Sequence, residues 1–135
     1  MCMKKPLKLK ITPYNAGKLA EFVCRFYMRF RGYRIICKNY KAKKRGRKTP
    51  FGEIDFIALK GKRIVFCEVK KRKKDDDFLK ALSFEQQIRI INGGLNFLKQ
   101  NKKYTNYSFS FDVFFVKFPF SVKRIKNAIQ TDKII

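Results

Sequence analysis

The chain has 135 residues, enough for one domain with a hydrophobic core and too few for two of ordinary size. Hydrophobic residues make up 45% of the sequence, with 15 Phe and 6 Tyr, which excludes a disordered basic tail. The 34 Lys and Arg outnumber the 10 Asp and Glu, and the net charge of +24 predicts a polyanionic partner, either nucleic acid or an anionic membrane surface. Because the chain has no His, His-based catalytic triads and His-ligated metal sites are excluded.

The cysteines and the apolar runs indicate where the protein works. The cysteines form no C-x-x-C pair and three lie in apolar runs, so we expect buried free thiols rather than disulfides or zinc: Cys2, Cys24, Cys37 and Cys67. The basic first residues are not followed by an apolar signal core, and no apolar run approaches the roughly 18 residues that span a bilayer. These features predict a cytoplasmic protein.

The first part of the chain is expected to form a helix, a strand and a basic loop after a flexible basic N-terminus at residues 1–13. Residues 15–31 have the apolar spacing of a helix, with a glycine as a stop: Leu19, Phe22, Val23, Phe26, Phe30 and Gly32. Such a stripe is normally part of the core. Residues 33–40 then form a strand rich in β-branched and aromatic side chains, and residues 41–50 form a basic loop.

A β-hairpin over residues 52–70 is the most informative prediction. Two apolar runs flank Gly61, whose tolerance of positive φ suits a two-residue turn. If Gly61 and Lys62 form that turn, the register gives these opposed pairs: Lys60 with Arg63, Asp55 with Glu68, and Glu53 with Lys70.

This register sorts the side chains of the hairpin onto two faces, because opposite residues and residues two apart share a face. One face receives four polar residues, Glu53, Asp55, Glu68 and Lys70. The other face receives five apolar residues, Ile54, Phe56, Val65, Cys67 and Val69. Two adjacent carboxylates repel each other unless a cation lies between them, so the pattern predicts a metal site beside a lysine. The alternative is a solvated strand face with a Glu53–Lys70 ion pair.

The remaining chain completes one α/β domain. A basic run at 70–74 and an acidic cluster at 75–77 come first. Ser83 and Gln86 then have the spacing of a capping box and open a helix that runs to residue 100. Its expected apolar stripe is Phe84, Ile88, Ile91, Leu95 and Leu98.

Three further features belong to this second half. Gly93 and Gly94 indicate close packing of the helix against the sheet. Residues 107–116 form an apolar strand in which Asp112 is expected to be buried and hydrogen-bonded. Residues 121–129 are expected to form a short final helix, which gives the order αβββαβα.

The arrangement of Asp55, twelve intervening residues, and then Glu68-x-Lys70 is similar to the layout of the PD-(D/E)-x-K nucleases. Phosphodiester cleavage uses one or two Mg²⁺ ions, which take hard oxygen ligands and keep several waters. The expected cofactor is therefore Mg²⁺, or Mn²⁺ in its place. Asp55 and Glu68 are its expected ligands, with Glu53 as a further one. Lys70 is expected to hold the attacking water or to offset charge on the phosphate.

A longer stretch of the chain resembles the GEIDLIA…VFVEVKxR signature of the YraN family of proposed endonucleases. The matching segments are residues 52–58 and 65–72, and further similar positions are Gly17, Glu21, Gly32, Asn39, Ala81, Gln87 and Asp112. The resemblance implies a single restriction-endonuclease-like domain over residues 1–135, with a mixed central β-sheet flanked by helices, close to Holliday-junction resolvases. It also implies catalytic roles for four residues, Asp55, Glu68, Lys70 and Glu21.

Basic residues flank the proposed site. Together with Gln86, which stands where many relatives carry lysine, they are the expected sequence-independent nucleic-acid contacts: Lys43, Lys44, Arg45, Arg47, Lys48, Lys71, Arg72, Lys73 and Lys74. The leading hypothesis is a Mg²⁺-dependent endonuclease for branched or otherwise structured DNA, dimeric if both strands are cut symmetrically. The alternatives are a non-catalytic DNA- or RNA-binding protein with the nuclease fold and a basic peripheral membrane protein.

Overall fold

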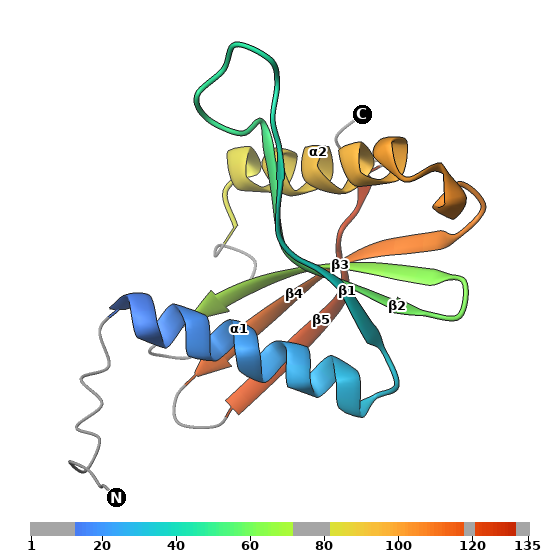
Figure 1. The fold of residues 1–135 in the computed structure, drawn as a ribbon. Coiled ribbons are helices and arrows are strands. Elements are labelled where there is room, and N and C mark those ends of the chain that lie inside the picture. Colours follow the sequence, from blue (N-terminus) through green and yellow to red (C-terminus); the bar gives the residue numbers. More distant parts are fainter. Residues whose placement is uncertain (1–12, 72–81, 118–120, 132–135) are drawn as a thin grey trace, which may run out of the picture.

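The computed structural model describes residues 13–71, 82–117 and 121–131. Its elements in chain order are α1 (Pro13–Phe30), β1 (Arg34–Ala42), β2 (Gly52–Lys60), β3 (Arg63–Lys71), α2 (Phe84–Gln100), the 3₁₀ helix η2 (Lys102–Tyr104), β4 (Ser108–Lys117) and β5 (Ser121–Ile129). The strands form one sheet in the order β1-β2-β3-β4-β5, in which β3 and β4 are parallel and the other neighbours antiparallel. The helices α1 and α2 cover opposite faces of this sheet (Figure 1). The expected single α/β domain with a mixed sheet between helices is confirmed.

The segment 121–129 is a strand, so the final helix expected there is wrong. β5 pairs antiparallel with β4 from Lys117 opposite Ser121 to Phe111 opposite Ile129, with a register shift between Phe111 and Val113. β4 is buried along most of its length. Without β5, the backbone N–H and C=O groups on that edge of β4 would lack partners, and this requirement overrides the local sequence pattern.

The central hairpin has the predicted register. Lys60 lies opposite Arg63, the pairs continue to Phe56 opposite Cys67, and Gly61 in the turn has a φ of 58°. The four apolar residues Phe56, Val65, Cys67 and Val69 share one face, under α1, as expected.

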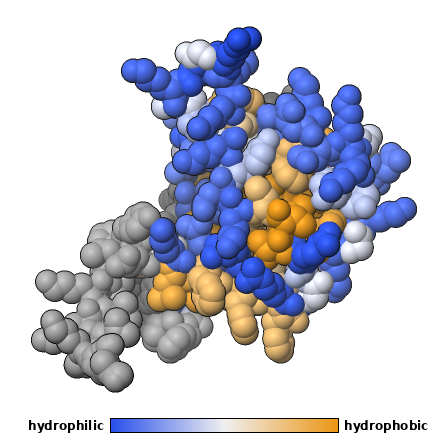
Figure 2. Space-filling model, in the orientation of Figure 1, coloured by the Kyte–Doolittle hydropathy of each residue, from blue (hydrophilic) through white to orange (hydrophobic). Residues whose placement is uncertain are grey.

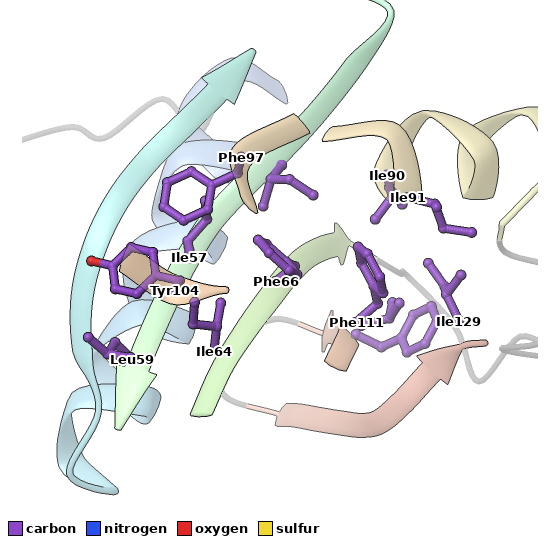
Figure 3. Close-up of a cluster of buried hydrophobic side chains, with 13 residues drawn as sticks. Ile57, Leu59, Ile64, Phe66, Ile90, Ile91, Phe97, Tyr104, Phe111 and Ile129 are labelled. Carbon is purple, nitrogen blue, oxygen red and sulfur yellow. The ribbon is translucent and has the colours of Figure 1, made fainter. Parts of the chain in front are cut away.

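The larger part of the core lies between the sheet and α2. Its buried side chains come from β2, β3, β4, β5, α2 and η2 (Figure 3), and they include Ile57, Phe66, Phe97, Tyr104 and Phe111. Phe66 stacks on Phe111 with ring centroids 5.1 Å apart, and Phe97 meets Phe66 edge-on at 6.0 Å. This dense aromatic packing anchors α2 to the sheet.

The side of α1 that packs on the sheet is not the one expected. Small or flexible residues four apart are buried there: Ala16, Ala20, Cys24 and Met28. Phe22, Phe26 and Phe30 are instead 52%, 59% and 86% exposed, and Leu19 is 44% exposed. The small side chains let α1 pack closely on the sheet. The aromatic stripe lies on another side of the helix and is therefore left at the surface.

The helix α2 begins as predicted and packs more closely than its apolar stripe suggested. Ser83 caps it, and the capping box with Gln86 is formed in both directions. A Cβ atom on Gly93 would lie 2.9 Å from the Glu53 backbone nitrogen, and one on Gly94 would lie 2.6 Å from the Phe111 ring, so the close approach is confirmed. The buried side of α2 therefore contains the two glycines, Ile90, Ile91 and Phe97. Two residues of the expected apolar stripe, Phe84 and Leu95, are exposed instead.

The remaining expectations concern thiols and termini. Cys24 and Cys67 are buried free thiols, as expected, while Cys37 is half-buried. Cys2, the acidic cluster at 75–77 and all but the last residue of the N-terminus at 1–13 lie outside the described residues. None of the helices in the described part of the chain has the length and apolar character needed to span a bilayer.

Candidate active site

The candidate site lies where the pairing of β2 and β3 ends. Past the Phe56–Cys67 pair, the Val69 backbone N–H donates a 2.8 Å hydrogen bond to Asp55 Oδ2. The Asp55 carboxylate therefore takes the place of a main-chain acceptor, and the opposed pairs expected beyond Cys67 are replaced by this contact. The acid is held in position by the backbone of the neighbouring strand.

The strand β2 is irregular at this point. Ile54 belongs with Ile57 to the cluster under α2, although residues three apart in a regular strand point to opposite faces. The expectation that Ile54 shares the face of Phe56 is therefore wrong. On β1, Asn39 lies between the pairs Lys38–Phe56 and Tyr40–Ile54 and has a left-handed φ of 52°. Asp55 therefore stands between Ile54 on the α2 side and Phe56 on the α1 side, and its carboxylate accepts a hydrogen bond from the β3 backbone.

Glu68 is the most perturbed group of the site. Burial raises the pKa of its carboxyl to about 9, with further contributions from a hydrogen bond to the Asp55 carboxyl and from the charge of Asp55. Lys70 opposes this rise, and its Nζ lies 3.5 Å from Glu68 Oε2. Only 15% of the Glu68 side chain and 19% of the Lys70 side chain are exposed. Two carboxyl groups this close share a proton unless a cation replaces it.

Glu21 approaches the same pair from α1. Burial, followed by the charge of Asp55, raises the pKa of the Glu21 carboxyl. Glu21 is therefore within electrostatic reach of Asp55. Its catalytic role, which the family resemblance implied, stays a prediction. The helix and both strands of the hairpin each contribute acids.

A cavity of about 130 Å³ opens on the α2 side of Glu68. Its lining consists of Glu53, Glu68, Lys70, Gln86, Arg89 and Ile90. The structure thus brings Gln86 of α2 to the predicted acids. Glu53 does not pair with Lys70 here; Arg89 Nη2 lies 2.9 Å from Glu53 Oε1, and both side chains are about half exposed.

Arg89 is the residue of this cavity that sequence reasoning missed. It follows Gln86 by three positions and therefore lies on the same side of α2. That spacing was a usable signal, because a helical residue three from an expected site residue shares its face.

The acids fit a divalent cation that keeps part of its water shell. Among the residues that the structure describes, no three Asp, Glu, Cys or His side chains form a ready-made metal cage. Mg²⁺ does not require one, because it is commonly bound by one or two carboxylates together with waters and substrate phosphates. The adjacent Asp55 and Glu68 carboxyls supply this donor set.

The predicted nucleic-acid contacts fall in separate places. Lys43, Lys44, Arg45, Arg47 and Lys48 are exposed in the loop between β1 and β2, which projects beyond α2 (Figure 1). Lys71 is the last residue of β3. The other three, Arg72, Lys73 and Lys74, lie outside the described residues.

Asp112 has the expected structural role. Its carboxylate accepts hydrogen bonds from Arg124 Nε at 2.8 Å and from the Asn127 backbone N–H at 2.9 Å. Ser110 Oγ donates a 3.1 Å hydrogen bond to Oδ1, the oxygen that also accepts from Asn127. With its side chain fully buried and ion-paired, Asp112 fixes β5 to β4.

Comparison with known proteins assigns the family. The uncharacterised protein family UPF0102 matches residues 20–116. A UPF0102 protein of Nitrobacter winogradskyi is 32% identical over 108 residues, covering 80% of this chain and 86% of its own. A UPF0102 protein of Ehrlichia ruminantium is 31% identical over 127 residues, 93% of both chains, and one of Syntrophus aciditrophicus is 40% identical over 101 residues, 73% of both. The chain belongs to the uncharacterised protein family UPF0102.

Proposed function

We propose that the protein is a metal-dependent endonuclease that hydrolyses phosphodiester bonds of DNA, with branched or otherwise structured DNA as its substrate. One observation carries the proposal: the Asp55 carboxylate, held by the Val69 N–H, lies beside the Glu68 carboxyl, and the Lys70 ammonium lies 3.5 Å from Glu68. Two neighbouring, partly buried carboxyls raise each other's energy when both are ionised, and a structural role alone gives no reason to place them together.

The roles of the residues follow from their chemistry. Asp55 and Glu68 would hold the cation, and Glu21 and Glu53 could complete its surroundings through water. When bound, Mg²⁺ or Mn²⁺ supplies a Lewis acid for the phosphate and acidifies a water molecule. Lys70 Nζ, 3.5 Å from Glu68, would orient the attacking water or stabilise charge that develops on the phosphate.

Substrate binding would rest on the positive charge around this site. Gln86 and Arg89 line the cavity on the α2 side, where they can donate hydrogen bonds to phosphate oxygens. The exposed basic loop between β1 and β2 would follow the backbone of the nucleic acid farther away. Contacts of this kind are independent of base sequence, so DNA structure would decide which substrate is cut.

The test is cleavage of linear, nicked and four-way-junction DNA of one sequence, with Mg²⁺, Mn²⁺ or EDTA. We expect cutting that requires the metal and is lost by at least about a thousandfold in Glu68→Gln, because a single group that stabilises the transition state is worth about this much. Glu85→Gln, an exposed acid near the start of α2, is the matched control and should cut like the wild type.

The alternative is a nucleic-acid-binding protein that keeps this fold without catalysis. The net charge of +24 favours binding whether or not the acids are active. Absence of cutting by the wild type on all substrates, with equal binding by wild type and Glu68→Gln, would establish this alternative.

A further inference from the structure

A second concave site lies at the other end of the central hairpin. It is a pocket of about 440 Å³ lined by Phe30, Arg31, Tyr33, Lys60, Arg124 and Lys126. Lys60 and Asp55 are five residues apart on β2, which corresponds to about 17 Å along an extended strand. The pocket is therefore separate from the candidate active site.

Four of the six lining residues are cationic and none is acidic. Lys60 Nζ donates a 3.0 Å hydrogen bond to the Arg31 backbone oxygen and lies 5.5 Å from the Tyr33 ring centroid. Its ammonium group has three donor positions, so this bond leaves others for a ligand. Within the described residues, neither Arg31, Lys60 nor Lys126 forms an ion pair, and only Arg124 is neutralised, by Asp112.

An aromatic surface leads into this pocket along α1. Phe22, Phe26 and Phe30 are four residues apart and more than half exposed, so they line one side of the helix. In Figure 2, apolar residues reach the surface along the lower part of the molecule, where Figure 1 shows α1, next to strongly hydrophilic residues. A groove of about 330 Å³ beside this stripe is lined by Val23, Phe26, Tyr27, Phe30, Arg31 and Val122.

The same helix joins the aromatic surface to the candidate active site. Glu21, which is within electrostatic reach of Asp55, directly precedes Phe22. From Glu21 to Phe30 the helix advances about 14 Å. The exposed phenylalanines thus extend along α1 from the level of Glu21 to Phe30, which lines the cationic pocket.

We infer that the α1 stripe and the cationic pocket bind one unpaired nucleic-acid strand, with bases stacked on the phenylalanines and a phosphate held by Arg31, Lys60 and Lys126. Proteins that bind single strands combine aromatic stacking platforms with a positive groove in this way. The inference rests on the proposed nucleic-acid substrate and narrows it to DNA with an unpaired strand next to the cutting point. Duplex DNA cannot use the phenylalanines, because its base faces are stacked on each other.

Charge favours this occupant over the other two that an apolar helix face suggests. A second copy of the chain also carries a net charge of +24. It would be repelled by the pocket, whose lining contains four cationic residues and no acid. A bilayer presents a plane of headgroups, whereas Lys60 and Arg124 line a recess that admits a discrete phosphate.

The experiment measures binding of a fluorescein-labelled 12-nucleotide oligodeoxythymidine to the full chain by anisotropy, with EDTA present to prevent cutting. We expect Phe30→Ala to weaken binding about tenfold, because stacking contributes about this much for each base. Lys126→Glu should weaken it by a similar factor and reduce the dependence of log affinity on log salt concentration. Leu95→Ala and Lys99→Glu, which make matched changes at exposed positions of α2, should stay within about twofold of the wild type.

Binding that Phe30→Ala leaves unchanged, or that Lys126→Glu and Lys99→Glu weaken equally, would overturn the inference in favour of diffuse charge attraction. So would Phe30-dependent sedimentation with phosphatidylglycerol vesicles that the oligonucleotide does not displace, or a Phe30-dependent dimer in light scattering. These outcomes are independent of the nuclease proposal. Loss of oligonucleotide binding in Phe30→Ala supports the pocket even if no DNA is cut, and metal-dependent cutting can persist if the pocket plays no part.

Discussion

The two ends of the β2–β3 hairpin carry opposite chemistry. At the open end, burial and then the neighbouring Asp55 carboxyl raise the pKa of Glu68 to about 9. At the turn end, Lys60 lines a pocket that contains cations and aromatic rings but no acid. Acids are scarce in this chain, 10 against 34 basic residues, and yet two partly buried ones lie side by side here.

The difference separates two uses of charge in one small domain. Surface cations attract a polyanion almost wherever they lie, and their individual positions matter little. A pair of partly buried acids raises the free energy of the folded state unless a cation or a shared proton compensates it, so the position of the pair is informative. The acids at the open end therefore carry the proposal about catalysis, and the cations at the turn end carry the proposal about strand binding.

The largest expected effect concerns the buried ion pair that joins β4 and β5. Arg124→Ala should lower the free energy of unfolding by about 3–5 kcal/mol, because it leaves the buried Asp112 carboxylate without its ion-pair partner. Arg89→Ala is the control at the open end, where the pair with Glu53 is about half exposed, and it should cost less than about 1 kcal/mol. Urea denaturation of both variants measures the difference. Equal losses would show that Asp112 is not held as the structure indicates.

The second prediction concerns catalysis at the open end. Lys70→Ala should reduce the rate of metal-dependent DNA cleavage about a hundredfold and leave DNA affinity within about threefold, since its ammonium acts next to Glu68 rather than on a distant phosphate. Single-turnover cleavage and anisotropy on the same substrate separate the two quantities. Lys99→Ala on α2 should change neither. A proportional loss of affinity in Lys70→Ala would assign the lysine to substrate binding.

A third prediction uses pH. The folded-state pKa of Glu68 lies above its ordinary value of 4.5, so folding favours the protonated form. Its contribution to the stability of the metal-free protein is complete below about pH 4.5 and is lost as the pH rises toward about 9. The melting temperature of Glu68→Gln minus that of the wild type should therefore increase across this interval, by several degrees, as about 4 °C corresponds to 1 kcal/mol. A constant difference would mean that Glu68 is ionised throughout.

The smallest expected effect distinguishes an exposed aromatic residue from a buried one. Phe30→Ala should change the free energy of unfolding by less than about 0.5 kcal/mol, because the side chain is 86% exposed. Phe66→Ala, which removes a fully buried ring, should cost about 3–5 kcal/mol. A large loss in Phe30→Ala would indicate a structural role for the α1 stripe and would weaken its assignment as a binding surface.

The sequence predicted what local rules determine. The turn at Gly61 fixed the hairpin register, and Ser83 with Gln86 fixed the start of α2. Features that depend on distant packing were missed. β5 exists because β4 needs a partner on its edge, and α1 turns its small residues inward because the sheet leaves little room.

The candidate site shows the same division. Alternation along β3 correctly placed Glu68 and Lys70 together, but it could not predict that β2 is irregular around Asp55 and sends Ile54 to the α2 side. Arg89 lies at the site because α2 packs on the hairpin, where it pairs with Glu53, 36 residues earlier in the sequence. The spacing of residues along the hairpin was therefore enough to predict that the acids lie together. The residues around them could be identified only from the folded structure.

The most direct test of the acid pair as a cation site is a titration of the protein with Mn²⁺, in which the electron paramagnetic resonance signal of the free ion is followed at about pH 8. The account predicts that the wild type binds Mn²⁺ and that Glu68→Gln loses this binding, while Glu85→Gln retains it. Binding that is equal in the wild type and Glu68→Gln, or no binding by the wild type with or without DNA, would contradict it.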